Sequence, residues 1–279
     1  MTAQHEWPAP DSDGASAVRD PFHDLRIALF GGDESEAVDS FAHLDPRREQ
    51  RKGVPEVILA GPKQPEQVVA VAQRFLERVG RAIISRTPPA TLGALEQAFG
   101  DSVAWERYDA AQVVVLRRHG LLRPQTGGQV GIITAGTADV PRAEEAAVVC
   151  REMGCEVHLV CDVGVAGLHR LIEPLRRMMG TPVDVIVVAA GMDGALPSVV
   201  AGLVDVPVIG LPTSVGYGIG GQGQAALLSM LQTCSPGLAV VNIDNGVGAG
   251  AMAAVIANNV ARARTKTPRE HPEQRTAGR

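Results

Sequence analysis

Five loops in the second half of this chain consist almost entirely of small or short polar residues. Each loop follows an apolar run, and their sequences are "AGTAD", "GVAGLHR", "GMDGALPS", "PTSVGYGIGGQG" and "DNGVGAG". Loops without bulk leave backbone N–H groups and hydroxyls open to a ligand, and ahead of a helix they bind phosphate or carboxylate. One such loop is an ordinary turn, whereas five after successive apolar runs predict a shared anion-binding cleft.

Two side chains near these loops have the chemistry of a base and of a nucleophile. Asp193 lies between Gly191 and Gly194, where a carboxylate could remove a proton. Cys234 ends the helical stretch "LLSMLQTCSPG". The C-terminal end of a helix is its negative end, which disfavours a thiolate, so a small core residue is the commoner role for such a cysteine. A cationic substrate beside Cys234 would reverse that penalty.

Several other polar residues fit a structural role as well as a functional one. Asp139 precedes Pro141 and is typical of a helix N-cap, while Glu144 and Glu145 suit the start of a helix dipole. His169 and Arg170 fit the solvated face of a helix. The stretch "GYGIGGQG" either wraps a phosphate or is a mobile loop. The segment "AGTADV" lacks the G-x-G-x-x-G pattern, and no segment has the G-x-x-x-x-G-K-[ST] pattern, which disfavours ordinary dinucleotide and P-loop sites.

Alternating apolar runs and helical segments must position these residues. The alternation predicts an α/β fold in which a parallel sheet of about five strands is covered by helices on both faces. The carboxyl ends of parallel strands share one edge, so the five loops should meet there. We expect strands at 130–134, 155–163, 184–190, 206–211 and 238–243, and helices at 141–153, 165–179, 194–204, 223–233 and 247–262.

The chain divides at "PQTGGQ", residues 124–129, which is typical of a linker. Upstream, residues 21–123 predict a small α/β domain with extended segments at 56–60, 81–85 and 110–118 and a helix at 65–80. Downstream, residues 130–262 form the second predicted domain, which carries the five loops. Residues 1–20 and 263–279 are polar and rich in charge or proline, which predicts disordered tails.

Composition excludes several classes of protein. The net charge is -5 and aromatic residues make up 3%, which disfavours nucleic-acid binding. No apolar run reaches the roughly 18 residues of a membrane span, and the N-terminus lacks the apolar region of a secretory signal. The four cysteines have no CxxC spacing, which disfavours a zinc site or a disulfide scaffold. We therefore expect a soluble cytoplasmic protein.

The order of motifs resembles the LarB family. The matching segments are "TAGTADVPRAEEA", "DVGVAGLHRL", "AAGMDGALPSVVAGLV", "PVIGLPTSVGYG", "ALLSMLQTCSPG" and "VVNIDNGVGAGAMAAVIA", with a thinner match through "DPRREQRKGVPEVILAGPKQPEQV". The second half is also distantly similar to PurE, the carboxylase of aminoimidazole ribonucleotide, so a PurE-like three-layer domain is implied. The histidine of the PurE motif "GGAAHLPG" falls on Ala195 here, which disfavours PurE chemistry itself.

The LarB resemblance implies a reaction on nicotinic acid adenine dinucleotide. A carboxyl group from CO2 or bicarbonate is added to the pyridinium ring, and the phosphoanhydride is hydrolysed to give pyridinium-3,5-biscarboxylic acid mononucleotide and AMP. The product serves synthesis of the nickel-pincer nucleotide cofactor in lactate racemase maturation. The implied mechanism divides the carboxylation into easier steps through a transient cysteinyl–ring adduct.

The resemblance also implies roles for individual residues. Cys234 matches the family's "C-x-P-G" cysteine and is the predicted nucleophile, and Asp193 is the predicted base at a position where the family usually has Glu. The cations Arg47, Arg48, Arg51, Lys63 and Arg86 fit surface solvation, although one or two could clamp the adenylate half or the pyrophosphate. The predicted substrate-binding residues are Thr134, Thr137, Asp139, His169, Arg170, Ser198, Thr213, Ser214, Gly216, Gly221, Asp244 and Asn245.

The resemblance further implies a homo-oligomer, because PurE-like proteins form octamers. The apolar helix at 247–262 could pack against other subunits. Phosphoanhydride hydrolysis often uses Mg2+, but the sequence shows no ligand cluster, so no metal residues are assigned. Two alternatives stay open: a PurE-like aminoimidazole ribonucleotide carboxylase or mutase, and a nucleotide-binding regulatory protein without catalysis.

Overall fold

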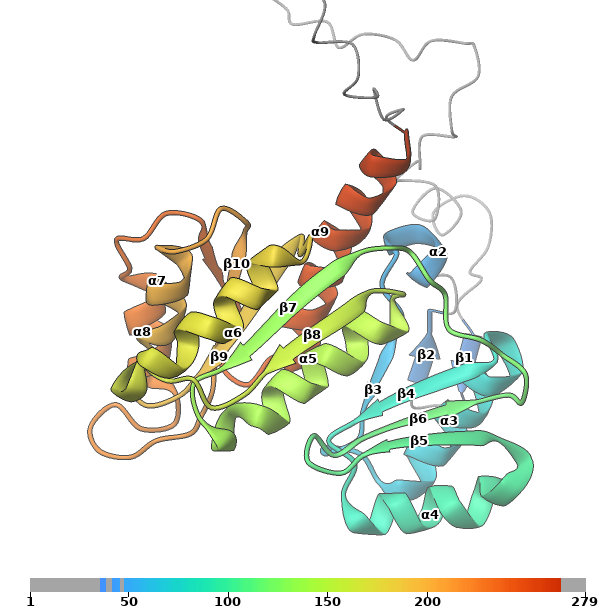
Figure 1. The fold of residues 1–279 in the computed structure, drawn as a ribbon. Helices are drawn as coiled ribbons and strands as arrows, with labels where there is room; N and C mark the ends of the chain where they lie inside the picture. Colours follow the sequence, from blue (N-terminus) through green and yellow to red (C-terminus); the bar gives the residue numbers. More distant parts are fainter. Residues whose placement is uncertain (1–35, 39–41, 46–47, 267–279) are drawn as a thin grey trace, which may run out of the picture.

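A computed structural model describes residues 36–38, 42–45 and 48–266 (Figure 1). The tail expected at 1–20 lies outside the described residues, as do residues 267–279. The described chain contains a five-stranded sheet, a four-stranded sheet and a short antiparallel pair, β1 (Glu36–Val38) with β2 (Ala42–Leu44). The larger sheet comes from the second half of the chain and carries the predicted cleft loops.

The larger sheet is wholly parallel, which confirms the predicted fold class. Its strand order is β11-β10-β9-β7-β8. The three central strands are buried along nearly their whole length, because helices cover both faces and leave no face for polar residues. The strands are β7 (Gln129–Thr134), β8 (Glu156–Val160), β9 (Val185–Ala190), β10 (Val208–Pro212) and β11 (Leu238–Val240).

Helices cover the two faces in separate groups (Figure 1). One face is packed against α5 (Val140–Glu152) and α9 (Gly246–Lys266). The other face is packed against α6 (His169–Gly180), α7 (Leu196–Ala201) and α8 (Gln224–Leu231). The segment expected to be helical at 194–204 is thus only six residues of helix. Helix α9 is longer than expected and includes the first four residues of the predicted C-terminal tail.

Helices α5 and α9 pack closely because small residues face one another. A Cβ added to Gly250 would collide with the carbonyl oxygen of Ala146 and lie 2.9 Å from its Cα, and one added to Gly246 would lie 2.5 Å from the carbonyl oxygen of Arg142. The contact is extended by buried alanines on both helices. The small-residue stripe of 247–262 therefore faces α5 of the same chain. Met252 is exposed elsewhere on α9, and packing of this helix against other subunits stays a prediction.

The smaller sheet is mixed and has the order β3-β4-β6-β5. Its strands are β3 (Val57–Leu59), β4 (Arg81–Ser85), β5 (Ala104–Tyr108) and β6 (Val113–Arg117). One face is packed against α3 (Pro65–Arg78) and α4 (Pro89–Phe99), and the short α2 (Arg48–Lys52) precedes β3. These elements form the N-terminal unit.

Helix α5 lies between the two sheets (Figure 1) and joins them. Its Val148 packs among Ile83, Val113 and Val115 of the smaller sheet. One turn further on, Glu152 is fully buried and forms ion pairs with cations of the N-terminal unit and the linker. These cations are Arg81, Arg117 and Arg123. Because α5 contacts protein on both sides, most of its residues are buried and it lacks a clear polar face.

Candidate functional site

The candidate site lies where the strand order of the parallel sheet reverses. The chain leaves β7 toward β8 on one side, whereas β9 continues to β10 and β11 on the other. Ligands of open parallel sheets bind beyond the carboxyl ends of the strands at such a point. All five predicted loops follow carboxyl ends of this sheet. Hydrogen bonds link the loops after β7, β9, β10 and β11 to one another, and Asp162, ahead of the loop after β8, donates to Thr134 at the end of β7.

Asp139 lies at the centre of this edge. It follows β7 in the turn Thr137–Asp139 and is 3% exposed. Its Oδ2 accepts a hydrogen bond from the amide of Gly136 (2.9 Å), and its Oδ1 accepts one from the hydroxyl of Thr213 (2.6 Å), which follows β10. Burial raises the pKa of Asp139, although these donors and the amide of Gly191 oppose the rise. The carboxylate thus ties together the ends of β7, β9 and β10.

Asp244 forms a second centre after β11. Its carboxylate accepts hydrogen bonds from the amide (2.9 Å) and the hydroxyl (2.6 Å) of Ser214, and the Arg142 guanidinium lies 3.6 Å away. The backbone of Asp244 is left-handed, with φ of 57°, and its amide donates to the carbonyl of Pro212 (2.8 Å). The turn therefore fixes the start of the loop that follows β10.

That loop is rich in glycine because the backbone approaches its neighbours closely. The amide of Met192 donates to the carbonyl of Val215 (2.8 Å), and Gly216 has φ of 146° beside Met192. Gly221 closes a turn onto the carbonyl of Gly218 (3.1 Å). The tip of the loop exposes Tyr217 (83%) and Ile219 (109%). The loop is thus anchored by backbone hydrogen bonds and presents an exposed apolar tip.

Two family models match this chain. Residues 129–276 match the model described as AIR carboxylase, and residues 35–118 match the model described as LarB/PurE-like N-terminal domain. The first model alone covers more than half of the chain. The chain belongs to the AIR carboxylase family. In this chain the AIR carboxylase match begins at the first residue of β7, and the match to the LarB/PurE-like N-terminal domain ends one residue after β6.

The relatives of this chain differ in sequence identity and in the share of the chain that they match. An uncharacterized protein of Methanocaldococcus jannaschii is 41% identical over 254 residues, which are 84% of this chain and 96% of that protein. The N5-carboxyaminoimidazole ribonucleotide mutase of the same organism is 35% identical over 125 residues, 44% of this chain and 74% of the mutase. The corresponding mutase of Thermotoga maritima is 30% identical over 131 residues, which are 46% of this chain and 74% of that mutase. A solved PurE structure from Treponema denticola is 17% identical, with a TM-score of 0.36, over 54% of this chain and 100% of that one.

Of the residues predicted from the sequence, several meet at the carboxyl edge. Thr134 is fully buried, and its hydroxyl accepts from the amide of Asp162 (3.0 Å). Thr137 and Asp193 are exposed at the rim, next to Asp139 and Gly191 respectively. His169 is exposed at the start of α6, and Arg170 donates to Asp162 (2.7 Å). Asp139 occupies the residue before α5, but its carboxylate makes no capping bond to that helix.

Two predicted binding residues have structural partners instead. The side-chain oxygen of Asn245 accepts from the amide of Gly248 (2.8 Å), which makes Asn245 the N-cap of α9. Ser198 lies within α7, and its carbonyl oxygen accepts a hydrogen bond from the hydroxyl of Ser235 (2.9 Å). These contacts stabilise the helices that lead away from the edge.

Cys234 lies apart from Asp139 and Asp193, although the next residue, Ser235, contacts Ser198. Helix α8 ends at Leu231, so the cysteine does not end a helix, as its sequence had indicated, but follows one. It is exposed in the segment that leads into β11, where the carbonyl of Gly237 accepts from the amide of Val208 at the start of β10. Cys234 is therefore on the amino-terminal side of the sheet, whereas Asp193 and Asp139 are on the carboxyl side. Five residues of β10 separate the two sides, about 16 Å at roughly 3.3 Å per residue.

The sequence interpretation missed two residues of the site and undervalued a third. Arg142 and Glu145 fit the first turns of a helix, and nothing local distinguished them from solvated residues. Glu145 is 1% exposed and accepts a hydrogen bond from Ser85 of the N-terminal unit. Arg86, one of five cations noted there, donates to the carbonyl of Asp244 (2.5 Å). Spacing in the sequence carries no signal for a contact across 158 residues.

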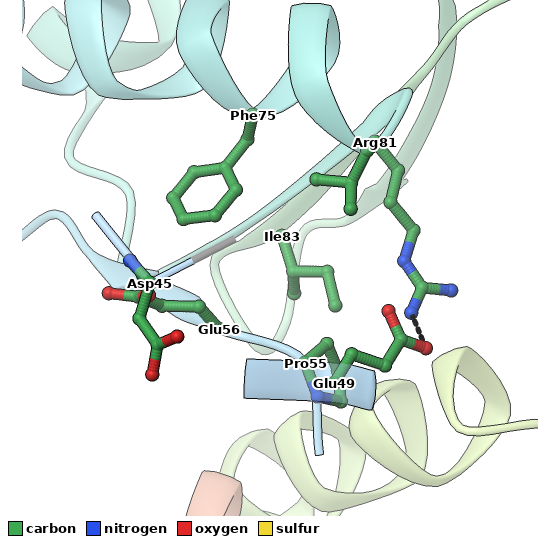
Figure 2. Close-up of a pocket in the computed structure, with 8 residues that line it drawn as sticks. Asp45, Glu49, Pro55, Glu56, Phe75, Arg81 and Ile83 are labelled. Carbon is green, nitrogen blue, oxygen red and sulfur yellow. Dashed lines mark hydrogen bonds and ion pairs between the residues drawn. The ribbon is translucent and has the colours of Figure 1, made fainter. Parts of the chain in front are cut away.

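Two hollows lie away from this edge. The one in Figure 2 belongs to the N-terminal unit, and its charged residues already have partners: Arg81 pairs with Glu49 (2.6 Å) and Asp45 with Arg51 (2.5 Å). The other is a groove along β8 and α6 that includes His158 and Arg177. Neither hollow contains a residue of the Asp139 or Asp244 centres. The candidate site is therefore identified by its polar residues and by the strand order, and not by a cavity.

Within the described residues, no three side chains of His, Cys, Asp or Glu gather in a way that could hold a metal ion. No helix in the same part of the chain is both long and apolar enough to cross a membrane.

Proposed function

We propose that this chain carboxylates the pyridinium ring of nicotinic acid adenine dinucleotide and cleaves its phosphoanhydride. The products are pyridinium-3,5-biscarboxylic acid mononucleotide and AMP, the reaction implied by the LarB resemblance. The observation that carries the proposal is the match of residues 35–118 to the LarB/PurE-like N-terminal domain, joined to a carboxylase-family domain. Ala195 supports it, because the PurE motif has a histidine at that position.

The carboxylation requires an electron-poor ring to become a nucleophile. A thiolate adds to the ring carbon beside the nitrogen, and the electron pair of the broken double bond neutralises the ring nitrogen. The next carbon of the resulting dienamine then forms a bond to CO2. A base removes the proton from that carbon, the C–S bond breaks, and the thiolate and the aromatic cation return. The net change is replacement of one ring hydrogen by a carboxylate, with release of a proton.

The carboxyl edge offers suitable partners for such a substrate. The amides and hydroxyls of the loops bind anions, and Arg142 adds a positive charge beside Ser214. Asp193, exposed next to Gly191, is the candidate base, and it is one methylene shorter than the glutamate usual in the family. Water then cleaves the P–O–P linkage, which transfers the nicotinate half to water and releases AMP.

The position of Cys234 sets a condition on this mechanism. The cysteine is exposed on the amino-terminal side of the sheet, and the anion-binding loops are on the opposite side of the same chain. We infer that the thiolate that meets the ring comes from Cys234 of a second copy. A homo-oligomer, which the resemblance implies, would supply it.

Isotope-labelled bicarbonate provides the test. The protein is incubated with nicotinic acid adenine dinucleotide and labelled bicarbonate, and mass spectrometry follows AMP and a labelled dicarboxylate mononucleotide. Cys234→Ser should abolish the product, whereas Cys161→Ser, which changes the other exposed cysteine, should keep it. Mixing Cys234→Ser with Asp193→Asn subunits should restore part of the activity if the two residues act across copies.

The outcomes separate the candidate functions. Binding of the dinucleotide without AMP would leave a regulatory binding protein. Turnover of aminoimidazole ribonucleotide or its N5-carboxylated form, and none of the dinucleotide, would favour the mutase reaction named for the Methanocaldococcus jannaschii relative. Wild-type turnover by Cys234→Ser would refute the covalent mechanism.

A further inference from the structure

Arg86 of the N-terminal unit extends into the carboxyl edge of the other domain. It follows β4 directly, and its φ of 53° lies in the left-handed region that a long side chain rarely adopts. Its Nη2 donates to the carbonyl oxygen of Asp244 (2.5 Å). Non-glycine residues in this conformation persist where surrounding structure holds them, and they gather at functional sites.

A buried carboxylate lies beside the Nε atom of the Arg86 side chain. Glu145 of α5 is 1% exposed, accepts a hydrogen bond from the hydroxyl of Ser85, and has its Oε1 3.7 Å from Nε of Arg86. Among the described residues, Glu145 Oε2 and Arg86 Nε have no hydrogen-bond partner. The buried charge of Glu145 is thus offset by the Ser85 hydroxyl and by the nearby guanidinium of Arg86, whose side chain is partly exposed.

The contact continues from Asp244 into the anion-binding loop. The carbonyl that accepts from Arg86 belongs to the residue whose carboxylate holds the amide and hydroxyl of Ser214. Arg142 lies on the same carboxylate. Movement of the Asp244 turn would therefore move Ser214, and with it the first residues of the glycine-rich loop.

We propose that Arg86 is a positioning residue of the site, through which the N-terminal unit sets the Asp244 turn and the Ser214 end of the loop for the anionic part of the substrate. The chemical part of this inference rests on the proposed function. The structural part does not, because the contacts exist without a substrate. The N-terminal unit then helps to set the geometry of the site on the larger sheet.

A second contact between the units provides a matched control. Arg81 pairs with Glu152 (3.5 Å) at the other end of α5, and its Nη1 donates to the carbonyl of Glu152 (2.9 Å). Arg81→Ala weakens the attachment of the N-terminal unit without touching Asp244. Any effect seen in Arg86→Ala and not in Arg81→Ala therefore belongs to the Asp244 turn and not to attachment in general.

Hydrogen exchange tests the structural part without substrate. In Arg86→Ala, exchange of the amides in a peptide covering residues 212–217 should rise at least about tenfold, the effect of losing a charge-assisted hydrogen bond. Arg81→Ala should leave that peptide unchanged, and Arg86→Lys should restore part of the protection, since an ammonium can still donate to the Asp244 carbonyl. Unchanged exchange in Arg86→Ala, or an equal rise in Arg81→Ala, would overturn the proposal.

Steady-state kinetics test the chemical part. Arg86→Ala should raise KM for the dinucleotide or lower kcat at least about tenfold, with partial rescue in Arg86→Lys. Wild-type kinetics in Arg86→Ala would overturn the positioning role in catalysis even if exchange changes. If the wild type itself gives no product while the exchange result holds, the proposed reaction fails and the structural link stands.

Discussion

The hydrogen bond between Thr213 and Asp139 predicts a large and pH-dependent effect of a nearly isosteric change. Thr213→Val removes the hydroxyl that donates to Asp139 Oδ1 (2.6 Å), and both residues are buried. The valine keeps the volume, so packing stays nearly unchanged while a buried carboxylate oxygen loses its donor. Loss of a hydrogen bond to a charged group lowers the free energy of unfolding by about 1.5–3 kcal/mol, which is the expected effect near neutral pH.

The direction of the pH dependence follows from the raised pKa of Asp139. The hydroxyl of Thr213 opposes that rise, so Thr213→Val raises the pKa further. In the unfolded chain the carboxyl has its ordinary value of 3.8. A carboxyl whose pKa rises on folding stabilises the fold at low pH, and this stability is lost as the pH rises through the folded pKa. The variant should therefore approach the wild type in acid and fall below it as the pH rises.

Urea unfolding at constant protein concentration and a series of pH values measures this difference. A double-mutant cycle with Asp139→Asn isolates the interaction, because an amide carries no charge that depends on the hydroxyl. Thr213→Val should cost about 0.5–1.5 kcal/mol in the Asp139→Asn background, the range of a neutral hydrogen bond. An equal cost in both backgrounds and at every pH would refute the assignment of Asp139 as a buried carboxylate held by Thr213.

Two further predictions concern packing and thiol chemistry. Gly250→Ala should destabilise the fold by about 1–3 kcal/mol in thermal or urea unfolding, because its Cβ meets the backbone of Ala146. Gly93→Ala, whose Cβ meets nothing within 4 Å inside α4, should be neutral or stabilising, and equal effects of the two changes would contradict the close contact of α5 and α9. A thiol reagent should modify two cysteines in the native protein and four in urea, since Cys161 and Cys234 are exposed and burial raises the pKa of Cys155 to about 11 and that of Cys150 still further. Fast reaction of more than two thiols in the folded protein would show that Cys150 or Cys155 is accessible.

Much of the fold was predictable because parallel sheets impose a strong local pattern. A strand covered on both faces is mostly apolar along its length, so β9 appears in the sequence as an unbroken apolar run and β7 as the largely apolar stretch 130–133. The sharing of one edge by carboxyl ends then brings Thr134, Asp139 and Thr213 together without knowledge of the strand order. The small-residue loops that follow the strands indicate the same edge of the sheet independently.

Contacts between distant segments were not predictable in this way. The glycine and alanine stripe of α9 has the composition of a helix interface, whether within one chain or between subunits. Only the packing of the helices showed that α5 covers it. Cys234 is adjacent in sequence to β11, but its side of the sheet depends on the length and direction of α8.

By itself, the sequence determined the parallel sheet, its edge of small loops and the residues that end its strands, because helix and strand periods and burial are local properties of the chain. Only the tertiary structure decided that Asp139 binds Thr213 and does not cap α5, that Arg86 extends from the N-terminal unit to Asp244, and that Cys234 lies on the opposite side of the sheet. Those outcomes depend on the order of the strands, the direction of α8 and the packing of both sheets on α5. Such packing is a sum over residues far apart in the chain, and no local pattern records it.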